Sequence, residues 1–287
     1  MANVPLLSVV AYPLAKNWIA GKSVSEALSC SKLANTRGFS VILNYLGEEV
    51  ETQDEVQETL REYKNLLDLL QPNRILGCIS VKPTQLGLKM DEDFCRTNLI
   101  DLTGHANKLG RFLWIDMESS RFTDDTINIY KALFATNKNV GICIQAYLRR
   151  SEEDIEELVG IGGKIRLVKG AYNEPKTIAY KTRKDIDRNY ARLMERLFRT
   201  SSNLFSVATH DDALVEEAIR MSEKRPKNFE FAFLKGIREN LKLQLSHRGY
   251  RVTEYIPYGK NWIPYSIRRI REKPSNFLLL ARSVLAK

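Results

Sequence analysis

The feature that most constrains the fold is an alternation of short apolar runs with longer amphipathic stretches, repeated eight times along the 287 residues. Several of the runs are apolar throughout, which is typical of strands in a parallel sheet covered on both faces. The predicted strands are Val41–Leu46, Leu76–Lys82, Phe112–Met117, Val140–Tyr147, Ile165–Lys169, Phe205–Thr209, Phe229–Leu234 and Val252–Tyr258.

Many of the amphipathic stretches begin with Asp or Ser, which can cap the first turn of a helix. The predicted helices are Asp54–Leu70, Asp91–Leu109, Asp124–Thr136, Ser151–Val159, Asp185–Thr200, Asp211–Lys224 and Gly236–Arg248, with a leading helix at Ser23–Thr36 and a final one at Ser275–Ala286. Eight strand-then-helix units predict an α/β fold, a (βα)8 TIM-type barrel with an extra N-terminal helix and C-terminal helices. We expect one such domain over residues 1–287. An open doubly wound sheet is the main alternative.

The net charge of +9 is unevenly distributed along the chain. Residues 164–200 and 235–287 are rich in Lys and Arg, whereas residues 48–62 are acidic. A basic half of this kind is typical of proteins that bind nucleic acid, an anionic membrane surface or a phosphate-bearing cofactor. Because the basic residues are interleaved with apolar periodicity, the pattern favours a cofactor or surface role over a nucleic-acid arm.

Cysteine, histidine and glycine patterns exclude several kinds of site. The four cysteines form no CxxC pair, and Cys78 and Cys143 lie inside apolar runs, so we expect buried free thiols and a reducing cytoplasm. No phosphate-binding glycine loop is present, and the three histidines lack metal-ligand spacing, so no metal is expected. The N-terminus lacks the features of a signal peptide, and no apolar run is long enough to span a membrane.

In a (βα)8 barrel, functional residues gather where the strands end and the βα loops begin. The predicted strand ends carry side chains suited to binding or catalysis, and only the whole set, not any single member, argues against a structural role. They are Lys82, Asp116, Glu118, Gln145, Tyr147, Lys169, Tyr172, Thr209, His210, Asp211, Leu234 and Tyr255.

The last predicted strand leads into YIPYGKNWIPYSIRRIRE, residues 255–272, where a helix is expected to begin near Pro264. Tyr265, Arg268, Arg269 and Glu272 then lie near one helix face. Paired guanidiniums are suited to binding a carboxylate, because each can donate two parallel hydrogen bonds and stays charged. Glu272, four residues after Arg268, is expected to hold that side chain in place.

At these residues the chain resembles the proline dehydrogenase family, FAD-dependent (βα)8-barrel enzymes, in its short monofunctional bacterial or archaeal form. The resemblance runs from about Gly21 to the C-terminus. Its seven ordered blocks are SVKPTQLGL, WIDMESS, IQAYL, RLVKGAYNEPK, ATHD, FEFAFLKG and YIPYGKNWIPYSIRRIREKPSN. Ordered blocks of this number and length are highly specific.

The resemblance implies oxidation of L-proline to Δ1-pyrroline-5-carboxylate, with a hydride passed to the flavin N5 and electrons passed on to a quinone-type acceptor. It also implies peripheral contact with the inner face of the membrane. Arg268 and Arg269 match the arginines that bind the proline carboxylate. The other matched pocket residues are Lys82, Asp116 and Glu272 as charged lining, and Tyr172, Leu234, Tyr255 and Tyr265 as walls. Of the pocket residues, Lys82, Asp116, Tyr255, Tyr265, Arg268 and Arg269 are expected to be catalytic.

The same resemblance implies which residues contact FAD. They are Gln145 at the flavin ring, Arg166, Lys169, Gly170 and Ala171 along the fifth strand, Thr182, Arg183 and Lys184 near the adenosine and pyrophosphate, and Thr209 and His210 after the sixth strand. The chain departs from the family pattern at Ala232, where relatives have Gln, and at Pro83, where they commonly have Leu. Two alternatives stay open: a Schiff-base (class I) aldolase using Lys169 or Lys82, and a nucleic-acid-binding module suggested by the charge.

Overall fold

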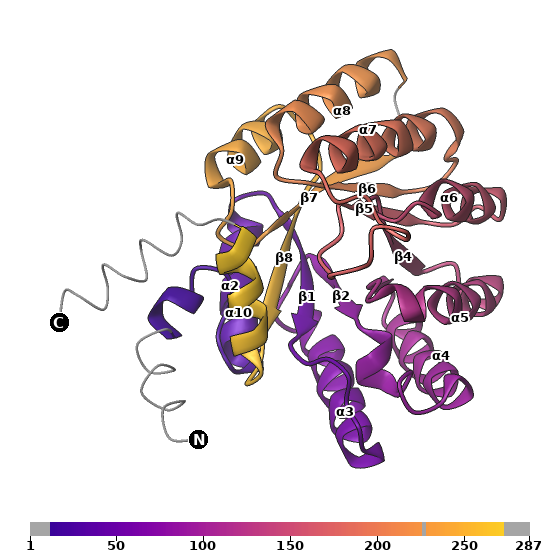
Figure 1. Ribbon diagram of the computed structural model, residues 1–287. Coiled ribbons are helices and arrows are strands. Elements are labelled where there is room, and N and C mark those ends of the chain that lie inside the picture. Colours follow the sequence, from indigo (N-terminus) through magenta and orange to yellow (C-terminus); the bar gives the residue numbers. More distant parts are fainter. Residues whose placement is uncertain (1–11, 226–227, 273–287) are drawn as a thin grey trace.

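Eight parallel strands form a closed barrel in the order β1 to β8 (Figure 1). The structure is a computed structural model that describes residues 12–225 and 228–272, the last three by their backbone alone. The strands are β1 Ser40–Tyr45, β2 Gly77–Val81, β3 Leu113–Ile115, β4 Val140–Gln145, β5 Ile165–Val168, β6 Phe205–Ala208, β7 Phe229–Leu234 and β8 Val252–Tyr258. The predicted (βα)8 barrel is confirmed, and the open doubly wound sheet is wrong.

The helices lie outside the ring of strands, from α3 in purple to α8 in orange (Figure 1). They are α2 Val24–Thr36, α3 Gln53–Leu70, α4 Glu92–Lys108, α5 Thr123–Thr136, α6 Ser151–Gly160, α7 Arg183–Thr200, α8 Asp212–Lys224, α9 Glu239–His247 and α10 Trp262–Glu272. Two 3₁₀ turns that the sequence did not predict, η1 Pro83–Leu86 and η2 Ser120–Phe122, follow β2 and β3. The predicted helix Ser275–Ala286 lies outside the described residues.

Helix α9 begins three residues later than predicted, at Glu239 rather than Gly236. Gly236 and Arg238 have positive φ angles of 73° and 59°, which a right-handed helix does not accommodate. A Cβ atom at Gly236 would lie 1.9 Å from the carbonyl oxygen of Asn17. The N-terminal segment therefore packs against the loop after β7 too closely for any larger residue there.

The barrel closes where its first strand meets its last. Residues Ser40 to Tyr45 of β1 pair in parallel with Thr253 to Tyr258 of β8, over the full length of β1. On its other edge β1 pairs with β2 at three positions, from Val41 to Leu43. The strands at the two ends of the sequence thus form the longest contact in the sheet.

Helix α10 lies against a small hydrophobic cluster separate from the main core. Trp262 and Tyr265 of α10 pack there with Trp18 and Ile19 from the segment before α2, and with Leu46 after β1. The Lys235 ammonium donates to the carbonyl oxygen of Lys16 at 2.7 Å. Residues from the beginning of the chain therefore fix the helix that carries the predicted arginine pair.

None of the helices in the described part of the chain is long and apolar enough to cross a bilayer. Within the same residues, no group of three or more His, Cys, Asp or Glu side chains could hold a metal ion.

Candidate active site

A cavity of about 590 Å³ opens at the carboxyl ends of the strands, and we call it the central cavity. All eight strands or the segments that follow them contribute to its wall, together with α10. Its lining residues are Asn44, Glu48, Lys82, Asp116, Met117, Cys143, Gln145, Arg166, Val168, Lys169, Gly170, Ala171, Tyr172, Arg183, Ala208, Thr209, His210, Asp211, Ala232, Phe233, Leu234, Ile237, Tyr255, Tyr265, Arg268 and Arg269.

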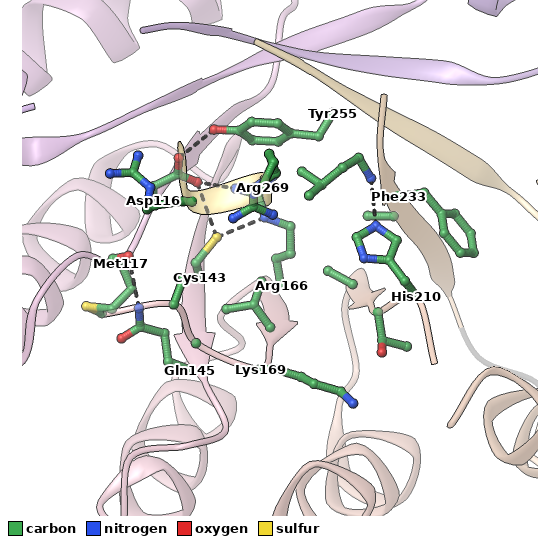
Figure 2. Close-up of a pocket in the computed structure, with 18 of the residues that line it drawn as sticks. Asp116, Met117, Cys143, Gln145, Arg166, Lys169, His210, Phe233, Tyr255 and Arg269 are labelled. Atoms are coloured by element: carbon green, nitrogen blue, oxygen red, sulfur yellow. Dashed lines mark hydrogen bonds and ion pairs between the residues drawn. The ribbon is translucent and has the colours of Figure 1, made fainter. Parts of the chain in front are cut away.

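The Asp116 carboxylate is the hub of the cavity floor (Figure 2). It is only 7% exposed and accepts hydrogen bonds from the Ser80 hydroxyl at 2.7 Å and the Tyr255 hydroxyl at 2.8 Å. It also pairs with Arg166 and, at 3.4 Å, with the Lys82 ammonium. Burial would raise the pKa of this carboxyl, but Lys82 and Arg166, together with the Ser80 and Tyr255 hydrogen bonds, outweigh burial and hold the pKa below its usual value. Asp116 is therefore a fixed negative charge at neutral pH.

Arg166 crosses the inside of the barrel and is 3% exposed. Its Nε donates to the Cys143 sulfur at 2.8 Å, and one terminal nitrogen, Nη2, donates to Ser80 and Asp116. The guanidinium also faces the rings of Trp114 and Tyr255, at 5.0 and 5.4 Å from their centroids. The other terminal nitrogen, Nη1, is buried without a hydrogen-bond partner among the described residues. A buried guanidinium N–H of this kind is suited to a ligand acceptor.

Lys82 is a charged ammonium at this site. Burial alone would lower its pKa, but Tyr172 and Asp116 beside it raise the pKa well above its ordinary value. A Schiff-base nucleophile must be a neutral amine, which requires a lowered pKa. The environment of Lys82 is therefore the opposite of what the aldolase alternative needs.

Helix α10 places Tyr265, Arg268 and Arg269 on the cavity wall, as their spacing predicted. The partner of Arg268 is Glu48 in the loop after β1. The Arg268 nitrogens Nη2 and Nη1 donate to the two carboxylate oxygens of Glu48 at 2.6 and 3.1 Å. The sequence suggested Glu272 for this task, and the side chain of Glu272 lies outside the described residues.

Lys169, in the segment after β5, also lines the cavity and lies between two carboxylates. It pairs with Asp187 and, at 3.2 Å, with Asp211, and Arg183 also donates to Asp211 at 2.9 Å. The basic segment after β5 is therefore partly neutralised by acidic residues of α7 and of the β6 loop. Beside it, Nε2 of His210 accepts a hydrogen bond from the Leu234 amide at 3.0 Å, so a neutral His210 carries its proton on Nδ1.

The central cavity brings together most of the site residues predicted from the sequence. Thr182 and Lys184 are exposed and do not line it. Thr182 instead caps α7, where its hydroxyl oxygen accepts from the Asp185 amide at 3.1 Å. Glu48 was not among the predicted site residues, because it lies in an acidic stretch that resembles an ordinary surface. Cys143 was predicted only as a buried thiol.

Glu118, two residues after Asp116, is a buried carboxyl that does not line the cavity. Its two oxygens accept from the backbone amide and the hydroxyl of Thr84, at 2.9 and 2.6 Å. Burial raises the pKa of Glu118 to about 7, and Glu48 adds to the rise, while Lys82 and the Thr84 hydrogen bonds oppose it. Glu118 thus titrates near neutrality in the folded protein.

We expect Glu118→Gln to change how stability depends on pH. In the unfolded chain the Glu118 carboxyl loses its proton near its ordinary pKa, so between about pH 5 and 7 unfolding releases a proton and rising pH favours the unfolded state. Relative to Glu118→Gln, the wild-type free energy of unfolding should fall by about 2 kcal/mol from pH 5 to pH 8. Urea denaturation of both proteins across this range measures the difference, and parallel curves would contradict the raised pKa.

Solved structures similar to this one include proline utilization A (PutA) from Bdellovibrio bacteriovorus, inactivated by N-propargylglycine. The TM-score is 0.82 at 24% identity, over 90% of this chain and 32% of that one. A PutA mutant from Bradyrhizobium japonicum gives a TM-score of 0.79 at 22% identity, over 94% of this chain and 32% of that one. The chain therefore spans about a third of these larger proteins, and the likeness shows a shared fold.

Similar sequences of comparable length include proline dehydrogenase 1 from Bacillus subtilis, 31% identical over 95% of this chain and 91% of that protein. Proline dehydrogenase from Deinococcus radiodurans is 33% identical over 95% of this chain and 90% of its own length. The family model described as proline dehydrogenase matches residues 27–279. The chain belongs to the proline dehydrogenase family, in its short monofunctional form.

Proposed function

We propose that this protein is an FAD-dependent enzyme that oxidises L-proline to Δ1-pyrroline-5-carboxylate. The observation that carries the proposal is a cavity at the carboxyl ends of the barrel strands. Two arginines of α10 line it together with Lys82, Asp116 and aromatic side chains. Proline is a zwitterion with an apolar ring, so a site that recognises it needs cationic, anionic and apolar surfaces together.

Several features of the cavity fit a flavin. Arg166 Nη1 is a buried donor, and Gln145 Oε1 is a buried acceptor, and neither has a hydrogen-bond partner within the described part of the chain. Both residues line the cavity, and the heteroatoms and N–H groups of a flavin ring would satisfy such groups. Gly170 has a φ of 109°, and a Cβ there would meet the Tyr147 ring at 2.3 Å, so at this one position only backbone lines the cavity.

FAD, when bound, would accept the hydride from the substrate and so carry the redox chemistry. The role that we propose for this chain is to bind and orient. Arg166 and Gln145 would hold the flavin ring, with Ala171 and Thr209 beside it. Lys169 and Arg183 would lie toward the diphosphate, where Asp187 and Asp211 already hold their charged groups in place.

On the substrate side, Arg268 and Arg269 would bind the carboxylate, and Tyr172, Leu234, Tyr255 and Tyr265 would enclose the ring. Tyr255 keeps its proton, because burial raises its pKa well above the ordinary value, and its hydroxyl donates a hydrogen bond to Asp116. Asp116 already accepts from five donors, namely Ser80, Lys82, Cys143, Arg166 and Tyr255. Its contribution would therefore be electrostatic orientation of the positive end of proline, and a fixed geometry of this kind accelerates reaction by positioning.

We further propose that the reduced flavin passes its electrons to a quinone-type acceptor. The protein would bind peripherally to the membrane to reach this acceptor. A soluble quinone analogue should then be reduced at the expense of L-proline by the purified protein. Binding of the protein to anionic liposomes at low salt tests the membrane contact, and activity confined to the soluble fraction without liposome binding would contradict it.

The test of the proposed function is the visible spectrum of the purified protein before and after anaerobic addition of L-proline. We expect flavin absorption that L-proline bleaches. A flavin spectrum that L-proline leaves unchanged would support FAD as the cofactor and reject L-proline as the substrate. Ala232 would then be the first residue to examine. A protein that cannot be reconstituted with FAD, and that borohydride traps with a carbonyl substrate, would favour the aldolase alternative.

A further inference from the structure

The loop that carries Glu48 contains a backbone conformation that needs support. Glu49, the next residue, has a φ of 51°, in the left-handed region that residues other than Gly, Asn and Asp rarely adopt. Its φ fixes the direction in which the chain leaves Glu48. Such a conformation costs on the order of 1 kcal/mol and persists only where neighbouring groups hold it.

The neighbouring group is the hydroxyl of Thr84, in η1. The Glu49 amide donates to Thr84 Oγ1 at 2.9 Å, and Thr84 Oγ1 donates to Glu118 Oε1 at 2.6 Å. A hydroxyl has one proton, so its bond to Glu118 turns an oxygen lone pair toward the Glu49 amide. Thr84 is 0% exposed and Glu118 is 3% exposed, so water does not compete at this junction.

The side chain of Glu49 offers weaker support. It pairs with Arg121 at 2.8 Å and with Lys89 at 3.5 Å, but these partners are 56% and 34% exposed. Exposed ion pairs contribute between about 0 and 1 kcal/mol, whereas leaving a buried hydrogen-bonding group without its partner costs about 1–3 kcal/mol. The backbone bond to Thr84 is therefore the main restraint on this part of the loop.

We infer that Thr84, backed by Glu118, is a positioning residue that holds the loop after β1 so that Glu48 binds and orients the Arg268 guanidinium. This inference rests on the proposed function, because it concerns the arginine that would bind the substrate carboxylate. Arg268 can bind Glu48 with both terminal nitrogens only if the Glu48 carboxylate is held in place. When Thr84 loses its hydroxyl, the loop moves, Arg268 loses its orientation and substrate binding weakens.

The experiment compares Thr84→Val, which keeps the shape and removes the hydroxyl, with Thr84→Ser, which keeps the hydroxyl. Amide hydrogen exchange reports on the loop directly. We expect the Glu49 amide to exchange at least about tenfold faster in Thr84→Val and within about threefold of wild type in Thr84→Ser, because exchange reports local opening. Amides of the barrel strands should be unchanged in both.

Steady-state kinetics with L-proline report whether the loosened loop weakens substrate binding. We expect the KM for L-proline to rise about fivefold in Thr84→Val with kcat within twofold, since a looser arginine weakens carboxylate binding. Thr84→Ser should restore the wild-type KM. Thr103→Val is the matched control, because Thr103 is also buried and its hydroxyl bonds only within α4. If Thr84→Val does not fold, Thr84→Ala, which also lacks the hydroxyl, is measured by the same exchange and kinetic experiments.

Three outcomes overturn the inference: unchanged Glu49 exchange in Thr84→Val, faster exchange with an unchanged KM, or a Thr84→Ser protein as impaired as Thr84→Val. Failure of the proposed function has a different signature. In that case L-proline does not reduce the flavin of the wild-type protein, while the exchange data still decide whether Thr84 anchors the loop.

Discussion

Replacing Arg268 or Arg269 with alanine is expected to lower kcat/KM for L-proline by about 100- to 1,000-fold, because removal of one partner of a desolvated charge pair costs about 2–5 kcal/mol. Both guanidiniums line the central cavity, on the same face of α10. The flavin should stay bound, since the residues proposed to hold it lie on β4, β5 and α7 and in the loops after β5 and β6, and none lies on α10. The loss should therefore appear in substrate kinetics and not in the visible spectrum.

The matched control is Arg199→Ala. Arg199 is 57% exposed at the end of α7 and pairs only with Glu195 of the same helix among the described residues. The Arg199→Ala substitution removes the same charge from the protein without changing the cavity, so kcat/KM should stay within twofold of wild type. Near-normal activity of both Arg268→Ala and Arg269→Ala would reject the assignment of these residues to the carboxylate.

Asp116→Ala is expected to be the most destabilising substitution in the site. It leaves the Arg166 guanidinium and the Lys82 ammonium buried without their shared carboxylate, and breaking a buried ion pair in this way costs about 3–5 kcal/mol. Asp116→Asn keeps the shape of the side chain and should lower the free energy of unfolding less, because its amide oxygen still accepts from Ser80 or Tyr255. Urea denaturation at pH 7 measures both free energies of unfolding.

Asp101→Ala is the comparison for this effect. Asp101 pairs with Lys64 at 2.6 Å between α4 and α3, but its side chain is 55% exposed. We expect Asp101→Ala to lower the free energy of unfolding by at most about 1 kcal/mol, as for other solvent-screened ion pairs. If Asp116→Ala cost no more than Asp101→Ala, the buried network would contribute nothing to stability, and the account of the cavity floor would be wrong.

The barrel could be predicted from the sequence because its determinants are local. Strand runs are marked by β-rich apolar residues, and helices by their period and by Asp or Ser at their starts, such as Ser23 and Asp91. The site could be located because parallel strands of a barrel end at one rim. The turns η1 and η2 span four and three residues, too few to show a period, so nothing in the sequence predicted them.

The partners of the site residues could not be predicted, since they depend on which side chains meet across the barrel. Glu48 is one of several acidic residues between positions 48 and 62, and only the closed barrel brings it to Arg268. In the same way, Cys143 is recognisable from the sequence as a buried thiol, but its hydrogen bond from Arg166 joins β4 to β5 inside the barrel. Periodicity reports which face of an element is buried and carries no information about such pairs.

The pairing of β1 with β8 has a consequence for biosynthesis. A ribosome releases β1 long before β8, so during translation the first strand exposes an unpaired edge while six other strands are made. Exposed strand edges are templates for association with other chains. The nascent protein should therefore be most prone to aggregation, and most dependent on chaperones, until residues 252–258 leave the exit tunnel. Slowing translation upstream of β8 would prolong this vulnerable period.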